Sequence, residues 1–170
     1  LKSLRKSISL VQQDTFLFTS SVSNNVLYGD PWAAKPDVVS AAERAQLHEH
    51  VAKLPQEYDT LIGERGLALS GGQRQRLNIS RSLLLGTHIL ILDDSTSAVD
   101  AGTEKKIREA LKEGAAERLT IIISHRVASL MHADQIVYME DGRILERGNH
   151  EELIKQGGNY AQLYQLQTID

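Results

Sequence analysis

No cysteine occurs among the 170 residues of this chain. The sequence therefore has neither a disulfide framework nor a thiolate metal site, which excludes a disulfide-stapled secreted module and a zinc finger. Aromatic residues are also scarce, at 5%, whereas hydrophobic residues reach 41% and charged residues 24%. This balance is ordinary for a globular chain and excludes a disordered or fibrous one. We expect a single domain.

Long hydrophobic runs are missing as well. The apolar segments at 89–92 and 119–123 have the length of strands, far short of the roughly 18 residues of a membrane-spanning helix. A basic cluster is also missing, because the net charge is −3 and lysine and arginine are spread along the chain. Nucleic acid is therefore not an expected partner. The chain opens on Leu1 and not on Met, and we expect it to be an interior piece of a longer protein.

The order of the apolar segments predicts an α/β fold. Residues 8–11 read as a short strand, and residues 89–92 lack alternation, which is typical of a parallel strand covered on both faces. A helix is predicted over 103–117, and a second buried strand over 119–124. A strand, a helix and a strand in this order imply a right-handed parallel crossover.

Two further helices are predicted before this core. The first begins near Pro36 and continues to Pro55, with an apolar stripe at i, i+4 and i+7 from Leu47. The second covers 73–85, with Ser70 in the position of its N-cap.

The last part of the chain carries local turn signals. Asp141-Gly142 lies between two short strand patterns and predicts a tight antiparallel hairpin. Asn149, with Glu152 three residues later, predicts the cap of a terminal helical region.

Polar residues follow directly on both core strands. Asp93 and Asp94 follow the strand at 89–92, and His125 follows the strand at 119–124. Taken singly, Asp93 and Asp94 are equally well explained as caps of the next turn, and a lone histidine is more often a packed or surface residue than a functional one. Ligands in open α/β sheets bind beyond the carboxyl ends of strands, however, so the two features together predict converging acid, base and metal groups.

A glycine pair opens the helix at 73–85. Gly71 and Gly72 leave backbone N–H groups bare at a helix N-terminus, where the helix dipole adds positive charge. Ser70 can add a hydroxyl donor. The segment 70–73 therefore predicts an anion site that is suited to phosphate.

These pieces resemble, in the same order and over essentially the whole chain, the motifs of the ATP-binding cassette (ABC) family. The segment 11–18 (VQQDTFLF) is similar to the glutamine loop, 69–73 (LSGGQ) to the family signature, and 89–94 (ILILDD) to the Walker B strand. The segment 97–100 (SAVD) matches the D-loop, and His125 matches the switch histidine.

The segment 60–66 (TLIGERG) resembles the loop of the exporter subgroup, of multidrug or lipid type. The resemblance implies the nucleotide-binding domain of an ABC exporter. It implies a partial P-loop NTPase (RecA-like) parallel sheet core, from 1–13 and 87–170, with an inserted α-helical subdomain at 14–86. In that subdomain we expect Trp32, with Phe16 and Phe18, to pack inside.

The family's site residues carry over position by position. Gln13 and Asp93 would hold Mg²⁺, for which oxygen ligands are suited. Asp94, with His125 and Gln13, would make up the catalytic set, and His125 would also contact the γ-phosphate of ATP. The remaining nucleotide-binding residues would be Ser70, Gly71, Gly72, Gln73 and Asp100.

Partners follow from the same resemblance. Such domains form head-to-tail dimers with two ATP molecules between them, so that the segment 70–73 of one chain meets the ATP held by a second nucleotide-binding domain. The transmembrane domain of the same parent chain would be the other partner. That arrangement would place this chain at the cytoplasmic face of the cell membrane, as a soluble part of the transporter.

The sequence departs from the family pattern in lacking a Walker A motif. That motif needs Gly-Lys-Ser/Thr, and none of the 12 glycines is followed by lysine. The phosphate-cradling amides and lysine supply much of the charge stabilisation in phosphoryl transfer. We therefore expect this chain alone neither to bind ATP tightly nor to hydrolyse it.

A second departure lies at Asp94, where hydrolysing members carry glutamate as the general base. The shorter side chain withdraws the carboxylate by about 1 Å, a misplacement that can cost ~10²-fold in rate. One interpretation is that Asp94 still works slowly. The other is that the chain is one half of a heterodimeric exporter with a degenerate site.

Two other classes stay open at this point. One is a soluble ABC ATPase that acts on nucleic acid or in translation, which residues 63–66 and the absence of a basic patch disfavour. The other is a shortened regulatory module without ATPase function.

Overall fold

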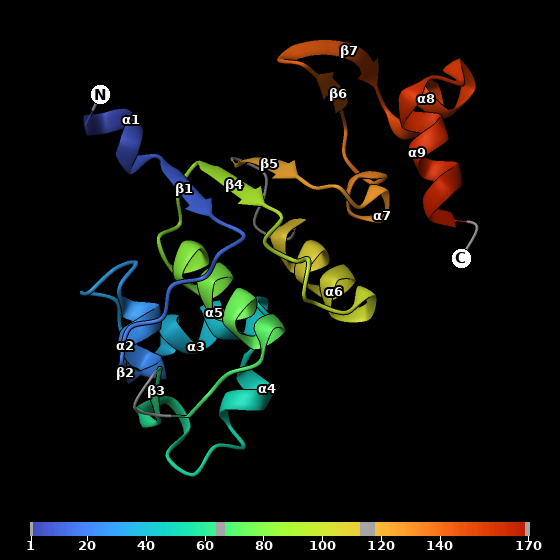
Figure 1. The fold of residues 1–170 in the computed structure, drawn as a ribbon. Helices are drawn as coiled ribbons and strands as arrows, with labels where there is room; N and C mark the ends of the chain where they lie inside the picture. The colour runs from blue at the N-terminus through green and yellow to red at the C-terminus, as the bar shows by residue number, and fades with distance from the viewer. Residues whose placement is uncertain (1, 64–66, 113–117, 169–170) are drawn as a thin grey trace. The chain divides into compact units, whose positions relative to one another are not determined.

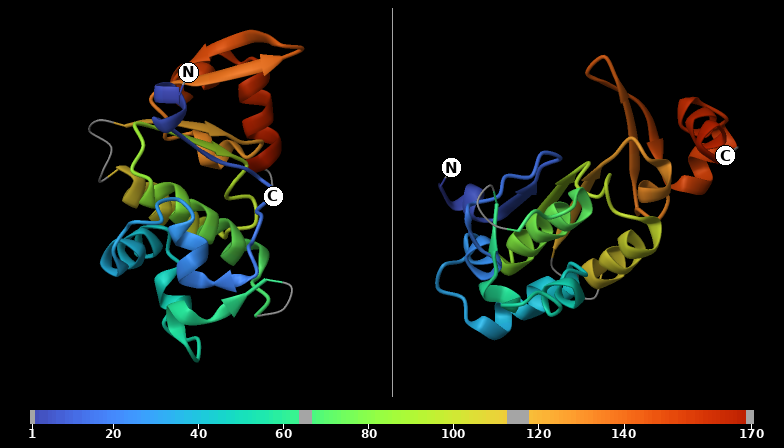
Figure 2. Two further views of the ribbon diagram at one scale, coloured as in Figure 1. Left: turned by 90° about the vertical axis from the view of Figure 1, so that its left-hand side faces the viewer. Right: turned by 60° about the horizontal axis from the view of Figure 1, so that its bottom comes forward.

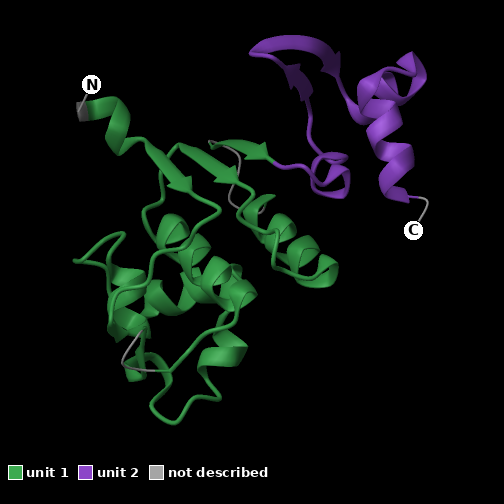
Figure 3. Ribbon diagram, viewed as in Figure 1, with its two compact units in different colours: residues 1–123 green, residues 124–170 purple. Residues whose placement is uncertain are grey.

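The computed structural model describes residues 2–63, 67–112 and 118–168. The chain divides into two compact units, 1–123 and 124–170, each of which is described here by itself (Figure 3). Within the described ranges, none of the helices has the length and apolar character needed to traverse a lipid bilayer.

The first unit contains a parallel sheet of three strands (Figure 1). Its order is β1 (Ile8–Val11), β4 (Ile89–Asp93) and β5 (Leu119–Ile123), with α6 (Ala101–Lys112) between β4 and β5 in the sequence. Leu92 pairs with Val11 on one side and with Ile122 on the other. The α/β fold with a parallel sheet and the strand-helix-strand order are therefore confirmed.

Helices α5 (Gly71–Leu84) and α6 lie on the same side of this sheet in Figures 1 and 2. Their apolar side chains form one core with the strands and with α3 (Lys35–Arg44), which comprises Val11, Ala41, Ala45, Ile79, Leu83, Leu90, Leu92, Val99, Ile107 and Leu111.

The strand at 89–92, expected to be covered on both faces, alternates between buried and half-buried positions in this chain, and the strand at 119–124, expected to be buried, alternates between exposed and half-buried positions over 119–123. Leu90 and Leu92 are buried, but the alternate positions of the sheet are open, with Leu10 50% and Ile121 41% exposed. Both faces of the sheet carry apolar residues, so the sequence of the strands shows no alternation of apolar and polar positions. For this reason it does not reveal that, in the first unit, α5 and α6 cover the same face of the sheet. Helix α6 also begins two residues earlier than predicted, and the part of its predicted range at 113–117 lies outside the described residues.

The helical part of the first unit consists of short elements around a second core. They are α2 (Val22–Leu27), α3, α4 (His48–Val51), the 3-10 turn η1 (Glu57–Asp59) and an antiparallel pair of β2 (Ser20–Ser21) with β3 (Leu61–Ile62). A one-turn helix, α1 (Lys2–Lys6), precedes β1. Val22, Val26, Leu47, Ile62 and Leu77 are fully or almost fully buried in this core.

The single helix predicted from Pro36 to Pro55 is in fact two helices. Helix α3 ends in a Schellman motif, in which the N–H of Leu47 donates to the carbonyl of Ala42 over 2.8 Å and that of Gln46 donates to Glu43 over 2.9 Å. Gln46 adopts φ 57° at the position where glycine is usual. Because no glycine marks this turn, the periodic pattern alone predicted a continuous helix.

The expectation that Trp32 is buried is also wrong. Its side chain is 94% exposed, so it does not pack inside the helical part. Phe16 is 69% exposed as well, and Phe18 is half-buried, with its ring centre 4.4 Å from that of Tyr28 and 5.1 Å from that of Phe16.

The second unit begins with α7 (Val127–Leu130) and continues with the hairpin of β6 (Ile136–Glu140) and β7 (Arg143–Gly148). Asp141 and Gly142 have φ of 48° and 72°, which is the geometry of the predicted tight turn. Helix α8 (His150–Gln156) starts in a capping box of Asn149 and Glu152, as predicted, and α9 (Asn159–Thr168) follows. The core of this unit comprises Val127, Ile136, Leu153 and Tyr160.

A buried arginine on α5 joins the helical part to the chain that leaves β1. Arg81, 8% exposed, donates through Nε to the carbonyl of Asn25 and through Nη2 to Oδ1 of the same residue, both over 2.6 Å. Its Nη1 donates to the carbonyl of Phe16 over 2.7 Å, and its guanidinium lies 5.3 Å from the ring centre of Phe18. One side chain thus satisfies carbonyl groups of two segments.

We predict that Arg81→Met lowers the free energy of unfolding by about 2–4 kcal/mol, because three acceptors, two of them in buried hydrogen bonds, lose a charged donor at once. Arg74→Met on the same helix, where the side chain is exposed, should change it by no more than about 0.5 kcal/mol. Denaturant unfolding of both variants is the measurement. Equal midpoints for the two would contradict this role of Arg81.

Candidate functional site

The first turn of α5 begins in a capping box. Ser70, in extended conformation at φ −64° and ψ 163°, accepts the N–H of Gln73 on its Oγ over 3.3 Å. The side chain of Gln73 accepts the N–H of Ser70 on Oε1 over 2.8 Å, and the N–H of Arg74 donates to the carbonyl of Ser70. The predicted N-cap is therefore confirmed, and the helix starts at Gly71.

Two donors of this turn remain for a ligand. In the described part of the chain, the backbone N–H groups of Gly71 and Gly72 have no hydrogen-bond acceptor, as is usual for the first residues of a helix. The Ser70 hydroxyl accepts a bond but still has its own proton to donate. A 14-residue helix that presents these donors can bind one oxyanion group.

Gln73 also has a local structural contact. Its Nε2 lies 3.2 Å from Nδ1 of His50. Burial, with Arg76 and Lys53 nearby, lowers the pKa of His50 and favours the neutral ring, whose Nδ1 can accept this amide proton. The nucleotide contact predicted for Gln73 stays a prediction.

Gly72 has a steric reason to lack a side chain. A Cβ at this position would lie 2.7 Å from the carbonyl oxygen of Ala98, which is too close for any residue other than glycine. A Cβ at Gly71 would be 3.4 Å from Cβ of Ala98. The segment 97–98 therefore lies directly on the first turn of α5.

The acidic strand end lies next to the glutamine segment. Since Val11 pairs with Leu92 in parallel register, Gln13, two residues after β1, and Asp93, the last residue of β4, lie at the carboxyl ends of neighbouring strands. Both offer oxygen atoms, which suit Mg²⁺. No cluster of three or more carboxylate or imidazole side chains with metal-binding geometry occurs in the described residues, so any ion here would keep several waters or ligand oxygens.

Asp94 has a left-handed backbone, with φ 43°, and its N–H donates to the carbonyl of Ile123 over 2.8 Å. Aspartate tolerates this conformation better than most residues. This backbone hydrogen bond connects the turn after β4 to the end of β5. It therefore fixes the position of the Asp94 backbone, from which the carboxylate side chain extends.

Asp100 caps helix α6. Its Oδ1 accepts the N–H of Thr103 over 2.9 Å, and its carbonyl accepts the N–H of Glu104. The hydrogen bonds from the backbone and side chain of Thr103 lower the pKa of Asp100, with a smaller contribution from Arg76. The predicted place of Asp100 at a dimer interface stays a prediction.

His125 belongs to the second unit. Its carbonyl accepts Nε2 of Gln167 over 2.7 Å, while Oε1 of Gln167 accepts the N–H of Val127. The side-chain amide of α9 thus holds the turn that carries this histidine. Its convergence with Asp93 stays a prediction.

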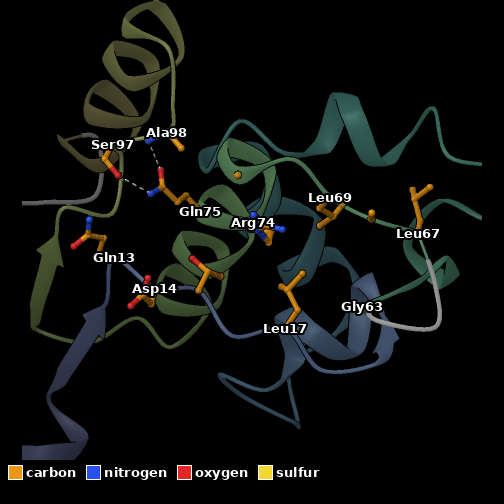
Figure 4. Close-up of a pocket in the computed structure, with 13 residues that line it drawn as sticks. Gln13, Asp14, Leu17, Gly63, Leu67, Leu69, Arg74, Gln75, Ser97 and Ala98 are labelled. Atoms are coloured by element: carbon orange, nitrogen blue, oxygen red, sulfur yellow. Dashed lines mark hydrogen bonds between the residues drawn. The ribbon is translucent and has the colours of Figure 1, made fainter.

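An open pocket of about 620 Å³ collects most of the first unit's predicted motifs (Figure 4). The glutamine segment, the signature turn and the segment after β4 all contribute to its wall, through Gln13, Asp14, Thr15, Leu17, Gly63, Leu67, Ala68, Leu69, Gly71, Arg74, Gln75, Ser97 and Ala98. Gln75 was not singled out from the sequence, where it was one of several polar residues on α5. Residues 64–66 of the exporter-like segment, Glu64 and Arg65 among them, lie outside the described residues.

Comparison with known proteins finds the same family that the motifs around this pocket resemble. The ABC transporter family profile matches residues 1–97. The chain is 52% identical over its full length to the ABC transporter ATP-binding protein YknU of Bacillus subtilis. It is 49% identical, over 98% of its length, to a putative multidrug export ATP-binding/permease protein of Staphylococcus aureus.

Among solved structures, that of a bacterial Atm1-family ABC exporter with ATP bound matches 98% of the chain with a TM-score of 0.93 and 39% identity. The present chain spans 29% of the length of each of these three proteins. It belongs to the ABC transporter family.

We predict that Gly72→Ala destabilises the protein by about 1–3 kcal/mol, because the added methyl group meets the backbone of Ala98 and the chain must shift. Gly102→Ala on α6, whose Cβ would lie 3.4 Å from Oδ1 of Asp100, should be neutral or gain up to about 1 kcal/mol of helix propensity. Denaturant unfolding compares the two. A similar effect for both would show that residue 72 is not held against the segment 97–98.

Proposed function

We propose that this chain is part of the nucleotide-binding domain of an ABC exporter, which couples ATP binding and hydrolysis to export across a membrane. The observation that carries the proposal is the first turn of α5, where Gly71 and Gly72 present two unbonded N–H groups beside the segment 97–98. The similarity to a putative multidrug export ATP-binding/permease protein supports the direction of transport.

In this proposal the chain's residues take part in two ATP sites. Ser70, Gly71 and Gly72 bind the terminal phosphate of an ATP that is held by a second, head-to-tail domain. Asp93 and Gln13 hold the water shell of Mg²⁺ at the chain's own site, and the ion supplies charge neutralisation when bound. Asp94 orients the attacking water, and His125 contacts the γ-phosphate.

The second partner is a transmembrane domain of the same parent chain, so the nucleotide-binding part lies at the cytoplasmic face of the membrane. The matched proteins are more than three times longer than this segment, and the S. aureus relative is described as an ATP-binding protein and permease in one chain. We assign the membrane passage of the substrate to that domain.

We further propose that Asp94 makes this chain the degenerate-site half of a heterodimer. Its own Walker B strand then belongs to the slow site, whereas its intact signature turn completes the active site of the partner. The proposal rests on the shorter side chain of Asp94, which withdraws the carboxylate by about 1 Å from where that of a glutamate would lie.

The isolated 170-residue chain should bind ATP only weakly. It has no Gly-Lys pair to cradle the α- and β-phosphates, and one helix N-terminus contributes only a part of the phosphate contacts. Isothermal titration calorimetry with MgATP should give no heat of binding at micromolar nucleotide. Binding with a dissociation constant in the micromolar range would contradict this expectation.

In the full-length pair, Asp94→Glu should raise ATP turnover, by up to about 10²-fold if the retracted carboxylate limits the slow site. Ser70→Ala should remove most turnover, because it deprives the partner's site of a donor. Phosphate release under saturating MgATP measures both.

Ser70→Ala also removes a helix cap, which costs about 1 kcal/mol. Ser21→Ala is the matched control, since Ser21 caps α2 by accepting the N–H of Asn24 over 3.1 Å. That variant should lose a similar amount of stability and keep its turnover. Equal modest losses in Asp94→Glu and Ser70→Ala would refute the assignment of the two sites.

A further inference from the structure

A buried glutamine connects α5 to the segment that follows β4. Gln75 is 6% exposed, and both ends of its side-chain amide are used. Its Nε2 donates to Oγ of Ser97 and its Oε1 accepts the backbone N–H of Ala98, each over 2.9 Å (Figure 4).

The segment held in this way leads directly from the acidic strand end. The N–H of Ser97 donates to the carbonyl of Asp94 over 3.2 Å, so only one tight turn separates Asp94 from the two bonds of Gln75. On the other side, Ala98 lies against the first turn of α5 at Gly72.

We propose that Gln75 is a positioning residue, which clamps the segment 97–98 to α5 and thereby couples the phosphate-binding first turn of this helix to the turn that carries Asp94. The coupling rests on the proposed function, in which the two features belong to different ATP sites. The clamp itself rests only on the contacts above.

The physical reason is the cost of separating the two parts. Gln75 is itself buried, so a side-chain amide that loses its partners there leaves a donor and an acceptor poorly hydrated. The segment 97–98 therefore moves with α5 as one body. When phosphate binding displaces the first turn of α5, the segment 97–98 moves with it, and this movement displaces the turn that carries Asp94.

The test is hydrogen–deuterium exchange in the full-length protein, resolved on peptides that cover 94–100 and 68–76. Gln75→Leu keeps the apolar bulk but removes both bonds, and exchange of the Ala98 amide should become faster by about tenfold. Ser97→Ala, which removes one bond, should have a smaller effect.

Gln75→Glu is the rescuing variant. Its carboxylate can accept the N–H of Ala98 and also the hydroxyl proton of Ser97, because serine can donate as well as accept. We expect exchange within about twofold of the wild-type rate. Ser80→Ala is the matched control, since it removes a buried hydrogen bond from Ser80 to the carbonyl of Arg76 within the same helix, and exchange of 94–100 should not change.

A non-hydrolysable ATP analogue then tests the coupling. In the wild type it should slow exchange in both peptides, whereas in Gln75→Leu it should slow only 68–76. Wild-type exchange of 94–100 in analogue-free Gln75→Leu would overturn the clamp. Slowing of both peptides by the analogue in that variant would overturn the coupling. If the analogue slows neither peptide in the wild type, the proposed function fails and the coupling with it, while the clamp is still decided by the analogue-free rates.

Discussion

Helix α5 is the element on which both apolar cores of the first unit depend. It presents Ile79 and Leu83 to the core beneath the sheet and Leu77 to the core of the helical part, while Leu84 packs against both. A helix buried along two sides cannot rotate or slide without opening one of these cores, because protein interiors are close-packed. Arg81 adds three hydrogen bonds to the same helix. The part of α5 from Leu77 onward is therefore anchored in both cores.

This constraint explains how a site can be built from short polar segments. The segment 70–73 is ordered by its own capping box, and the segment 97–98 is ordered by Gln75 and by the missing side chain of Gly72. Residues 71–73 form the first turn of α5, whereas residues 97–98 lie in a turn that is fixed against this helix. Helix-terminal N–H groups can therefore point at a ligand without a further entropic cost of ordering.

The acidic residues near β4 illustrate how one residue can have both a structural and a functional role. Asp100 caps α6, and the backbone of Asp94 bonds to β5 while its φ of 43° turns the chain away from the sheet. A substitution at either position changes local structure as well as charge. Kinetic effects of such variants therefore have to be compared with their effects on stability.

Several features that depend on contacts within three residues could be predicted from the sequence alone. The capping boxes at Ser70 and Asn149 and the tight turn at Asp141-Gly142 form as predicted, because their partners lie two or three positions away. The order of strands and helices was also readable from apolar periodicity, and with the motifs it indicated the family.

Which groups from distant positions in the chain come into contact is visible only once the chain is folded. The break of the predicted helix at Gln46, the exposure of Trp32, the one-sided cover of the sheet and the bonds from Gln75 to Ser97 and Ala98 have no local signature. Burial and long-range hydrogen bonds depend on how complete elements pack, and a residue's type fixes what it can bond to but not which partner reaches it.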